Sequence, residues 1–312
     1  MKTRLISFLI AGALVVSAQA DAQAHADSEV PVAEKPAQST SATENQSNKP
    51  EKPLLLTSRE GMEKSNALRI AVRDKNKAAA SAISGPRLWY AGFGLEGSSK
   101  AFAGDVKLTG QRLQELYPDV ISYIAYNDQT VETMQVPLAT LPGIENATYE
   151  IGKQAKPQDV AVMMISSHGN QHILGVKLDG EYAGPISDNY LEINLRRLKA
   201  VPTVLIISAC HAGSMIDTLK SENRIIITAA AADKSSYGCQ PLSENTFFID
   251  AMMGKTLNPE LSLNQLFVQM KADIAEREKK EKLTPSEPQL YVGEKMKAFA
   301  DKPINSWLKQ AS

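Results

Sequence analysis

A histidine and a cysteine each follow a short run of apolar residues, and both residue types can take part in catalysis. His168 follows the run 160–165 after two serines, and Cys210 follows the run 203–207 after Ser-Ala. Short runs of this kind are typical of strands buried on both faces of a parallel sheet. Ligands of open α/β sheets gather at the carboxyl ends of the strands. We therefore expect His168 and Cys210 to lie at one rim of a sheet, although 42 positions separate them.

This pairing suits nucleophilic chemistry. A cysteine attacks as the thiolate, and a nearby imidazolium lowers the thiol pKa enough to populate that form near neutrality. Gly169 lets the backbone approach a substrate closely, and its N–H and that of Cys210 together would hold a developing oxyanion. Taken singly, Cys210 fits an inert buried cysteine and His168 a loop histidine equally well. Their joint placement behind two apolar runs favours the catalytic interpretation.

Other reactive groupings fit less well. His211 is adjacent to Cys210 in sequence and is expected to point away from the thiol. The two cysteines lack C-x-x-C spacing, which disfavours zinc, and no G-x-S-x-G turn of a serine hydrolase is present. Gly92, Gly94 and Gly97 have the spacing of a dinucleotide loop, but no acidic residue follows a second strand at the required place. We expect a tight turn there, and neither a metal nor a cofactor.

The elements that must position these residues alternate between short apolar runs and amphipathic helices. This alternation predicts an α/β fold with a central, mostly parallel sheet. The predicted strands cover 87–91, 120–126, 160–165, 203–207 and 224–228, and the predicted helices cover 102–116, 191–198 and 262–282.

The N-terminal region has the composition of an export signal followed by a tether. Lys2 and Arg4 precede the apolar stretch 5–16, and a small-x-small pattern ends at Ala20, as in a secretory signal peptide. Twelve apolar residues are too few to span a bilayer, which takes about 20. We predict a signal peptide at 1–20, a disordered linker at 21–85 with a possible helix at 58–83, one catalytic domain at 86–300 and a C-terminal tail at 301–312.

These assignments bear on location and partners. The chain is expected to be exported, to the periplasm or beyond, with no integral membrane segment after signal removal. Its formal net charge of −1 favours neither nucleic acid nor an anionic membrane as a partner. In an exported chain the second cysteine, Cys239, is also a candidate disulfide partner of Cys210, and a bridge would silence the thiol. Oligomeric state, and whether the tether is a removable pro-segment, stay open.

Several blocks of sequence resemble one known family. They are the apolar strand with Ser167-His168-Gly169, the segment 208–215, the segment 227–239 with its Ser-Ser-Tyr-x-Cys ending, and the closing segment 284–290. Together they resemble the legumain-like cysteine peptidases, relatives of the caspases that include the catalytic subunit of the GPI-anchor transamidase. The resemblance covers about residues 86–293.

The resemblance implies a fold and a reaction. The fold would be a caspase-like three-layer sandwich around the central, mostly parallel sheet. The reaction would be endopeptidase cleavage of a peptide or protein substrate through a thioester on Cys210, with His168 as general acid/base. The oxyanion hole would consist of the backbone at Gly169 and Cys210. Alternatives within the family and fold are a transpeptidase or peptide ligase, and a catalytically silent binding module.

The resemblance also assigns a substrate pocket. Candidate substrate-binding residues are Ser208, Ser235, Ser236 and Lys100, and Cys239 would line the cleft as a free thiol. Legumain has an acidic residue two positions before its cysteine, where this chain has Ser208. A preference for Asn or Asp at P1 is therefore inherited by analogy only.

Overall fold

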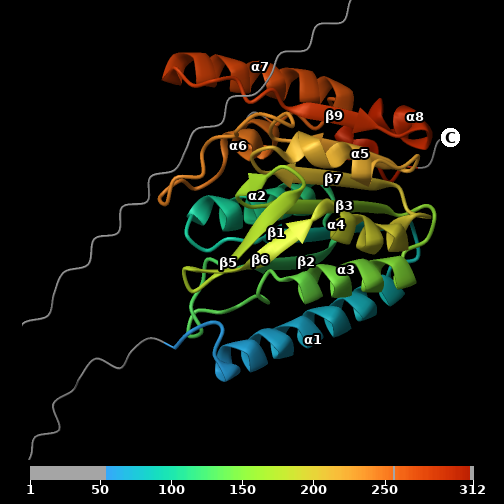
Figure 1. Cartoon of the computed structure of the whole chain (residues 1–312). Coiled ribbons are helices and arrows are strands. Elements are labelled where there is room, and N and C mark those ends of the chain that lie inside the picture. Colours follow the sequence, from blue (N-terminus) through green and yellow to red (C-terminus); the bar gives the residue numbers. More distant parts are fainter. Residues whose placement is uncertain (1–53, 256, 310–312) are drawn as a thin grey trace, which may run out of the picture. The chain divides into compact units, whose positions relative to one another are not determined.

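A six-stranded sheet forms the centre of the protein, whose computed structural model describes residues 54–255 and 257–309 (Figure 1). The strand order is β2-β1-β3-β7-β8-β9; the first five strands are parallel and β9 runs antiparallel to β8. The strands are β1 (Leu88–Gly94), β2 (Ile121–Tyr126), β3 (Val160–Ser166), β7 (Thr203–Ser208), β8 (Arg224–Thr228) and β9 (Gln289–Val292). The predicted signal peptide and the first half of the predicted linker, residues 21–53, lie outside the described residues.

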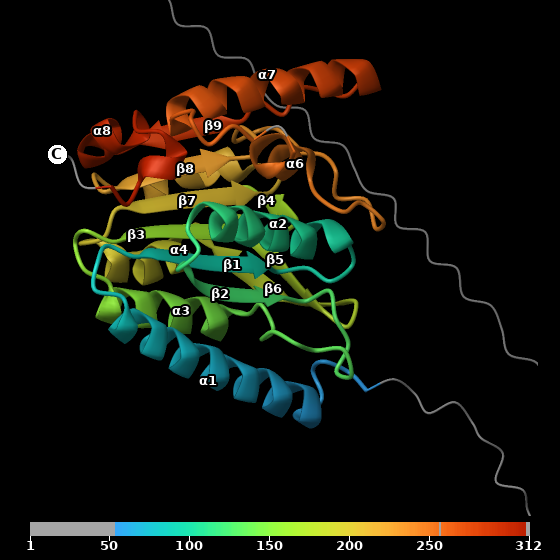
Figure 2. The same cartoon turned by 180° about the vertical axis from the view of Figure 1, so that it is seen from behind.

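Helices cover both faces of this sheet, because its central strands are apolar on both sides. Every residue of β1, β3, β7 and β8 is buried. One apolar core packs the sheet against α3 (Leu141–Gln154), α4 (Asp188–Leu195) and α5 (Ile216–Leu219). The opposite core packs it against α2 (Lys100–Leu116), α6 (Phe247–Met253) and α7 (Leu263–Glu281), as Figures 1 and 2 show from the two sides. The predicted three-layer α/β architecture with a mostly parallel sheet is confirmed.

A smaller antiparallel sheet, which the sequence did not predict, follows His168. Its strands are β4 (Gly169–Asn170), β5 (Ile173–Leu178) and β6 (Glu181–Ser187), in the order β4-β5-β6. Lys177 of β5 donates its N–H to the carbonyl of Leu95 (3.0 Å), just beyond the end of β1. The hairpin that contains Gly169 is thereby attached to the end of the neighbouring central strand.

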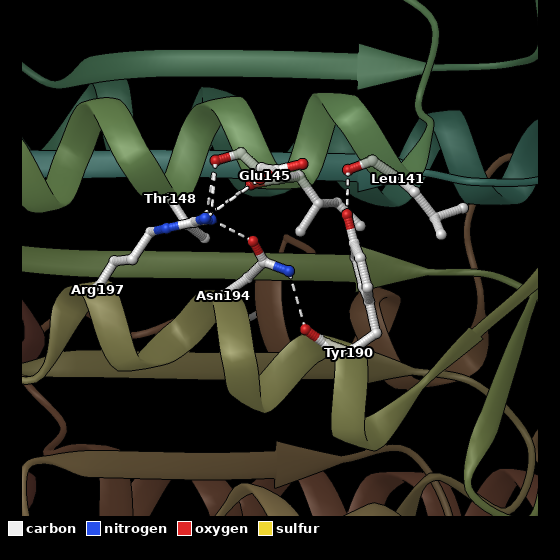
Figure 3. A network of polar contacts seen from close by, with 7 residues as sticks. Leu141, Glu145, Thr148, Tyr190, Asn194 and Arg197 are labelled. Carbon is white, nitrogen blue, oxygen red and sulfur yellow. Dashed lines mark hydrogen bonds and ion pairs between the residues drawn. The ribbon is translucent and has the colours of Figure 1, made fainter.

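Two helices on one face are joined by a polar network rather than by apolar contacts alone (Figure 3). Arg197, just after α4, contacts Asn194 and donates to Glu145 Oε1 of α3 (3.2 Å). Tyr190 Oη donates to the carbonyl of Leu141 at the start of α3 (2.9 Å). These bonds fix α4, which lies in the connection between β3 and β7, against its neighbour.

The helix α1 (Arg59–Ala82) covers the segment where the sequence predicts a helix at 58–83. It packs on the domain: the Leu138 N–H donates to Ser65 Oγ (3.0 Å), and Asn76 Nδ2 donates to the carbonyl of Ser122 in β2 (3.0 Å). Ahead of it, the Leu56 N–H donates to the carboxylate of Asp179 in the β5–β6 turn (2.7 Å). Residues 54–85, assigned to the linker from sequence, are thus attached to the domain.

A buried ion pair closes the amino ends of the central strands. Arg87 and Asp159 approach within 2.7 Å, with their side chains 4% and 0% exposed. Asp159 also accepts hydrogen bonds from the Arg87 N–H (3.0 Å) and from Trp89 Nε1 (3.1 Å), while Arg87 donates to two backbone carbonyls, those of Ala80 and Gln154. Every polar group of this pair has a partner, which is the condition for burying charge without a large penalty.

The boundaries differ from the sequence predictions in two places. The strand β1 continues to Gly94, so two of the three glycines with dinucleotide-loop spacing lie inside a strand rather than in a turn. Ile304 and Trp307, in the predicted tail, are buried against the core beside α7. Across the described residues, no helix combines the length and apolarity that a membrane crossing requires.

Candidate active site

His168 and Cys210 follow neighbouring strands that end in register. Ser166 of β3 pairs with Ser208 of β7, and the Ser167 N–H donates to the carbonyl of Ser208 (3.1 Å). Each reactive residue therefore lies two positions beyond the last paired residue of its strand. The parallel ladder places both at the carboxyl rim of the sheet, where the sequence predicted them to meet.

Gly169 brings the two strand ends into direct contact. A Cβ atom at this position would collide with the carbonyl oxygen of Cys210 and would lie 2.9 Å from the Cβ of Ala209. Real Cβ atoms do not approach this closely, so only glycine allows the turn after His168 to pass beside Cys210. The glycine thus serves close backbone approach, and the Gly169 and Cys210 backbones are neighbours as an oxyanion hole would require.

The thiol of Cys210 receives a backbone hydrogen bond. The Ser236 N–H donates to Cys210 Sγ (3.2 Å), and the Ser236 hydroxyl lies 3.7 Å from the same sulfur. The thiol can in turn donate to the carbonyl of Ser236, which lies 3.6 Å from the sulfur. Within the described ranges the N–H of Cys210 itself has no hydrogen-bond partner, so it is available to an incoming oxygen.

The imidazole of His168 is held by two residues from the β1–α2 region. Its Nε2 lies 3.3 Å from Oε2 of Glu96, and its ring packs edge-on against Phe102, with 4.9 Å between centroids. In the part of the chain that the structure describes, no hydrogen bond joins the ring to Cys210 Sγ. Such catalytic contacts are often long without substrate and tighten when it binds.

Glu96 is a candidate site residue that the sequence patterns did not single out. Its side chain is only 4% exposed, and it accepts from the N–H (2.9 Å) and the hydroxyl (2.6 Å) of Ser98. The N–H bonds Oε1, whereas the hydroxyl bonds Oε2, the same oxygen that faces His168 Nε2. The signal was present, because Glu96 stands just beyond the end of β1, at the same rim as the other two residues. The glycines on either side of it instead predict a turn.

The profile of the peptidase C13 family matches residues 106–298. The chain belongs to the peptidase C13 family. This is the legumain family, which is made up of cysteine peptidases, so the resemblance drawn from sequence is confirmed and the chain is a cysteine-type peptidase. The matched range contains both His168 and Cys210, whereas Glu96 precedes it.

Among solved structures, the chain is similar to caspase-1 from Spodoptera frugiperda. The two share 12% sequence identity with a TM-score of 0.47, and the similarity covers 66% of this chain and 86% of that one. No curated protein matches the sequence significantly.

The predicted pocket residues of this C13 peptidase divide into three groups. Ser235 and the side chain of Lys100, at the start of α2, are exposed; Ser236 lies against the thiol. Ser208 is 1% exposed, and its hydroxyl contacts Asp105 and Thr246 beneath the rim. The structure therefore corrects the assignment of Ser208 to the pocket wall, because the last residue of β7 faces the layer of α2 and α6.

The remaining histidines of the described chain face other partners. His211 has a left-handed backbone (φ 57°), and its Nδ1 lies 3.1 Å from the carbonyl of Ala232, which turns it away from the thiol as predicted. His172 pairs through Nδ1 with the buried carboxylate of Asp188 (2.7 Å). His168 and His172 have a spacing that can bind zinc on a helix, but here His168 precedes β4 and His172 lies in the turn between β4 and β5. Among the described residues no cluster of three His, Cys, Asp or Glu side chains can hold a metal.

Both cysteines are free thiols. Burial raises the pKa of Cys239, and the neighbouring Cys210 raises it further. A thiol with a raised pKa stays protonated near neutrality and is a poor nucleophile. Cys239 therefore does not compete with Cys210 for the chemistry.

Proposed function

We propose that this C13 peptidase is a cysteine endopeptidase in which Cys210 is the nucleophile, His168 the general acid/base and Glu96 a positioning residue for the imidazole. The observation that carries the proposal is the register of β3 and β7. It places His168, Gly169 and Cys210 at one rim, with a backbone donor on the sulfur and a buried carboxylate on the imidazole.

The proposed reaction follows from these contacts. The Cys210 thiolate attacks the substrate carbonyl carbon, and the developing oxyanion accepts hydrogen bonds from the N–H groups of Gly169 and Cys210. The imidazolium of His168 protonates the departing amine as the peptide bond breaks. Neutral His168 then takes a proton from water, whose oxygen attacks the thioester and regenerates the thiolate. Because Glu96 faces Nε2, the nitrogen left to exchange protons with thiol and substrate is Nδ1.

The specificity we propose is for a polar P1 residue, with Asn and Asp preferred as in legumain. The support is the family membership together with the polar contacts that Ser236 makes to the sulfur. A panel of peptides that differ only in P1, with Asn, Asp, Gln, Ala and Leu, tests it. Equal rates for Leu and Asn would contradict the preference while leaving the chemistry standing.

The central experiment compares two single-cysteine variants. Cys210→Ala is expected to abolish both peptide cleavage and labelling by a thiol-directed peptide probe. Cys239→Ala is the matched control and is expected to keep both within about twofold, because it removes a thiol of raised pKa outside the reaction. Cleavage by purified Cys210→Ala protein would overturn the proposal.

We also infer export, to the periplasm or beyond the cell, from the signal-like pattern of residues 1–20. The test is the N-terminal sequence of the mature protein recovered from fractionated cells. A start at Asp21 is expected. A start at Met1 in cytoplasmic material would refute export.

A further inference from the structure

One carboxylate lies beneath the active site and belongs to none of the roles assigned so far. Asp105, in the second turn of α2, is fully buried, three residues after the Phe102 that packs on His168. Its side chain points into the layer between α2, α6 and the carboxyl ends of β3 and β7. We ask what this group does there, since burying a carboxylate is costly.

Its hydrogen bonds come from three separate segments. The carboxylate oxygen Oδ2 accepts from the hydroxyls of Ser166 (2.7 Å), Ser208 (3.1 Å) and Thr246 (2.9 Å). The other oxygen, Oδ1, accepts from the Thr246 N–H (2.9 Å), with Asn245 Nδ2 at 3.5 Å. One group thus connects the last residue of β3, the last residue of β7 and the N-cap of α6.

Each of these segments leads directly into the active site. His168 follows Ser166 by two residues, and Cys210 follows Ser208 by two. Thr246 ends the loop that begins at Ser236, whose N–H contacts the Cys210 sulfur. Ser166 and Ser208 are also the last paired residues of β3 and β7. Beyond them, strand pairing no longer fixes the two segments relative to each other.

The chemistry of the cluster favours positioning over simple stability. Asp105 forms no salt bridge to any Lys, Arg or His in the described ranges, and it is satisfied only by neutral donors. In the ionised state every hydroxyl around it must donate inward, which fixes three hydroxyl orientations at once. An apolar side chain of similar size would fill the space without the cost of burying charge, but it would not fix the strand ends.

We propose that Asp105 is a positioning residue that sets the placement of His168 relative to Cys210 by holding the ends of β3 and β7 and the N-cap of α6 together. The inference rests on the proposed function of that pair. Without Asp105 the fold persists through its ladders and cores, and the two reactive groups lose their shared anchor.

The variant Asp105→Asn keeps the shape and changes the donors. One oxygen becomes an NH₂ group, which can be tolerated only at Oδ2, because the Thr246 N–H at Oδ1 cannot turn around. At the Oδ2 position the NH₂ group faces the three hydroxyls that donate to Oδ2 in the wild type. Because an NH₂ group cannot accept a hydrogen bond, the three hydroxyls lose their common acceptor. We expect kcat to fall by about 10–100-fold with KM within about threefold, since a displacement of about 1 Å at reacting groups costs about that much.

The decisive readout is the pH profile of Cys210 alkylation by iodoacetamide, measured on a Cys239→Ala background so that one thiol reacts. Displacement of His168 relative to Cys210 should move the midpoint of the Asp105→Asn profile upward by about 1 pH unit or more, toward the value of about 8.5 for a free thiol. A merely structural role would lower the melting temperature and leave this profile unchanged. An unchanged profile and kcat in folded Asp105→Asn protein would overturn the proposal.

Two further variant sets keep the test interpretable. Ser166→Ala and Ser208→Ala each remove one hydroxyl from the cluster, so both should move the profile in the same direction by less, and their effects should vanish in the Asp105→Asn background. The matched control is Asp159→Asn, which changes a buried carboxylate at the opposite end of β3. It should lower the melting temperature without moving the pH profile of Cys210 alkylation. Activity of the Cys210→Ala protein would refute the proposed function. If Cys210→Ala is inactive and Asp105→Asn has normal activity, only the inference about Asp105 is refuted.

Discussion

Buried carboxylates have different kinds of partner at the two ends of the central strands. At the amino end, Asp159 is paired with Arg87 and accepts three further hydrogen bonds from backbone and indole. At the carboxyl end, Asp105 and Glu96 have no Lys or Arg within 4 Å among the described residues; their partners are hydroxyls, amides and one imidazole.

The difference separates stability from chemistry along a single sheet. A carboxylate with a matched guanidinium is satisfied and closes one end of the fold. A carboxylate without a guanidinium partner is available to the polar groups of the site, as Glu96 Oε2 is at 3.3 Å from His168 Nε2. We therefore expect substitutions at the amino end to change the free energy of unfolding, and substitutions at the carboxyl end to change the rate of reaction.

The largest effect should come from breaking the amino-end pair. Arg87→Met leaves the Asp159 carboxylate buried without its cation and should lower the free energy of unfolding by about 3–5 kcal/mol, as removal of one partner from a buried pair generally does. Denaturant titration measures it. Peptidase activity per folded molecule, assayed at low temperature, should stay within about twofold. A large loss of kcat in protein that is still folded would erase the proposed separation of the two ends.

The second effect is a pH dependence of opposite sign at the two ends. Burial raises the pKa of Asp105 to about 6, against the ordinary 3.8, although four hydrogen bonds oppose the shift. Between about pH 4 and 6 the folded protein holds this proton while the unfolded chain releases it. Asp105 therefore contributes stability that is present below pH 4 and lost as the pH rises to 6, about 3 kcal/mol in all.

Asp159 works in the other direction. Burial alone would raise its pKa, but hydrogen bonds from Arg87, the Lys156 N–H and Trp89 outweigh burial and lower it. Its contribution is present above pH 4 and lost as the pH falls through the lowered value. Unfolding free energies at pH 3 to 7 for wild type, Asp105→Asn and Asp159→Asn separate the two. The Asp105→Asn protein should lack the fall between pH 4 and 6; Tyr90 and Cys239, which also face Asp105, stay neutral there.

A third, smaller effect is expected at Glu96. Glu96→Gln keeps the size and the hydrogen bond from the Ser98 N–H, but it requires the Ser98 hydroxyl to accept instead of donate and removes the charge beside His168 Nε2. The kcat should fall by about 10–100-fold, equivalent to about 1.4–2.7 kcal/mol, because the imidazolium loses its counter-charge. Stopped-flow acylation with a chromogenic peptide measures it. A fall in melting temperature with unchanged kcat would show that Glu96 contributes to stability and not to the reaction. The proposed difference between the two ends of the sheet would then not hold for Glu96.

The smallest effect should come from a surface pair that belongs to neither end. Arg59 and Glu63 on α1 form an ion pair at 2.8 Å with side chains 92% and 65% exposed. Exposed pairs of this kind contribute little because water and salt screen them. Arg59→Ala should leave both the melting temperature and kcat unchanged, which makes it the baseline for the other variants.

Much of the sheet could be predicted from sequence, because the central strands are apolar throughout and end at recognisable polar segments. The same pattern predicted that His168 and Cys210 would share a rim. Asp105 could not be assigned this way, since a lone carboxylate on a helix resembles any exposed acid until the fold buries it. Glu96 does stand at a strand end, but the glycines on either side of it predict a turn and give no sign that its carboxylate is buried. Ser208 was misassigned for a related reason: the direction of a strand's last side chain depends on register, which no local pattern fixes.

The in-register ends of β3 and β7 also constrain how this chain can change in length. The connection between the two strands contains the β4–β6 hairpins and α4, and it can gain or lose residues without moving either strand end. An insertion of one residue inside β7 would move every later side chain of that strand to the opposite face of the sheet. Side chains that now face Asp105 would then face α4. Related chains should therefore vary in the number of residues between histidine and cysteine, while the two-residue steps from Ser166 to His168 and from Ser208 to Cys210 stay fixed.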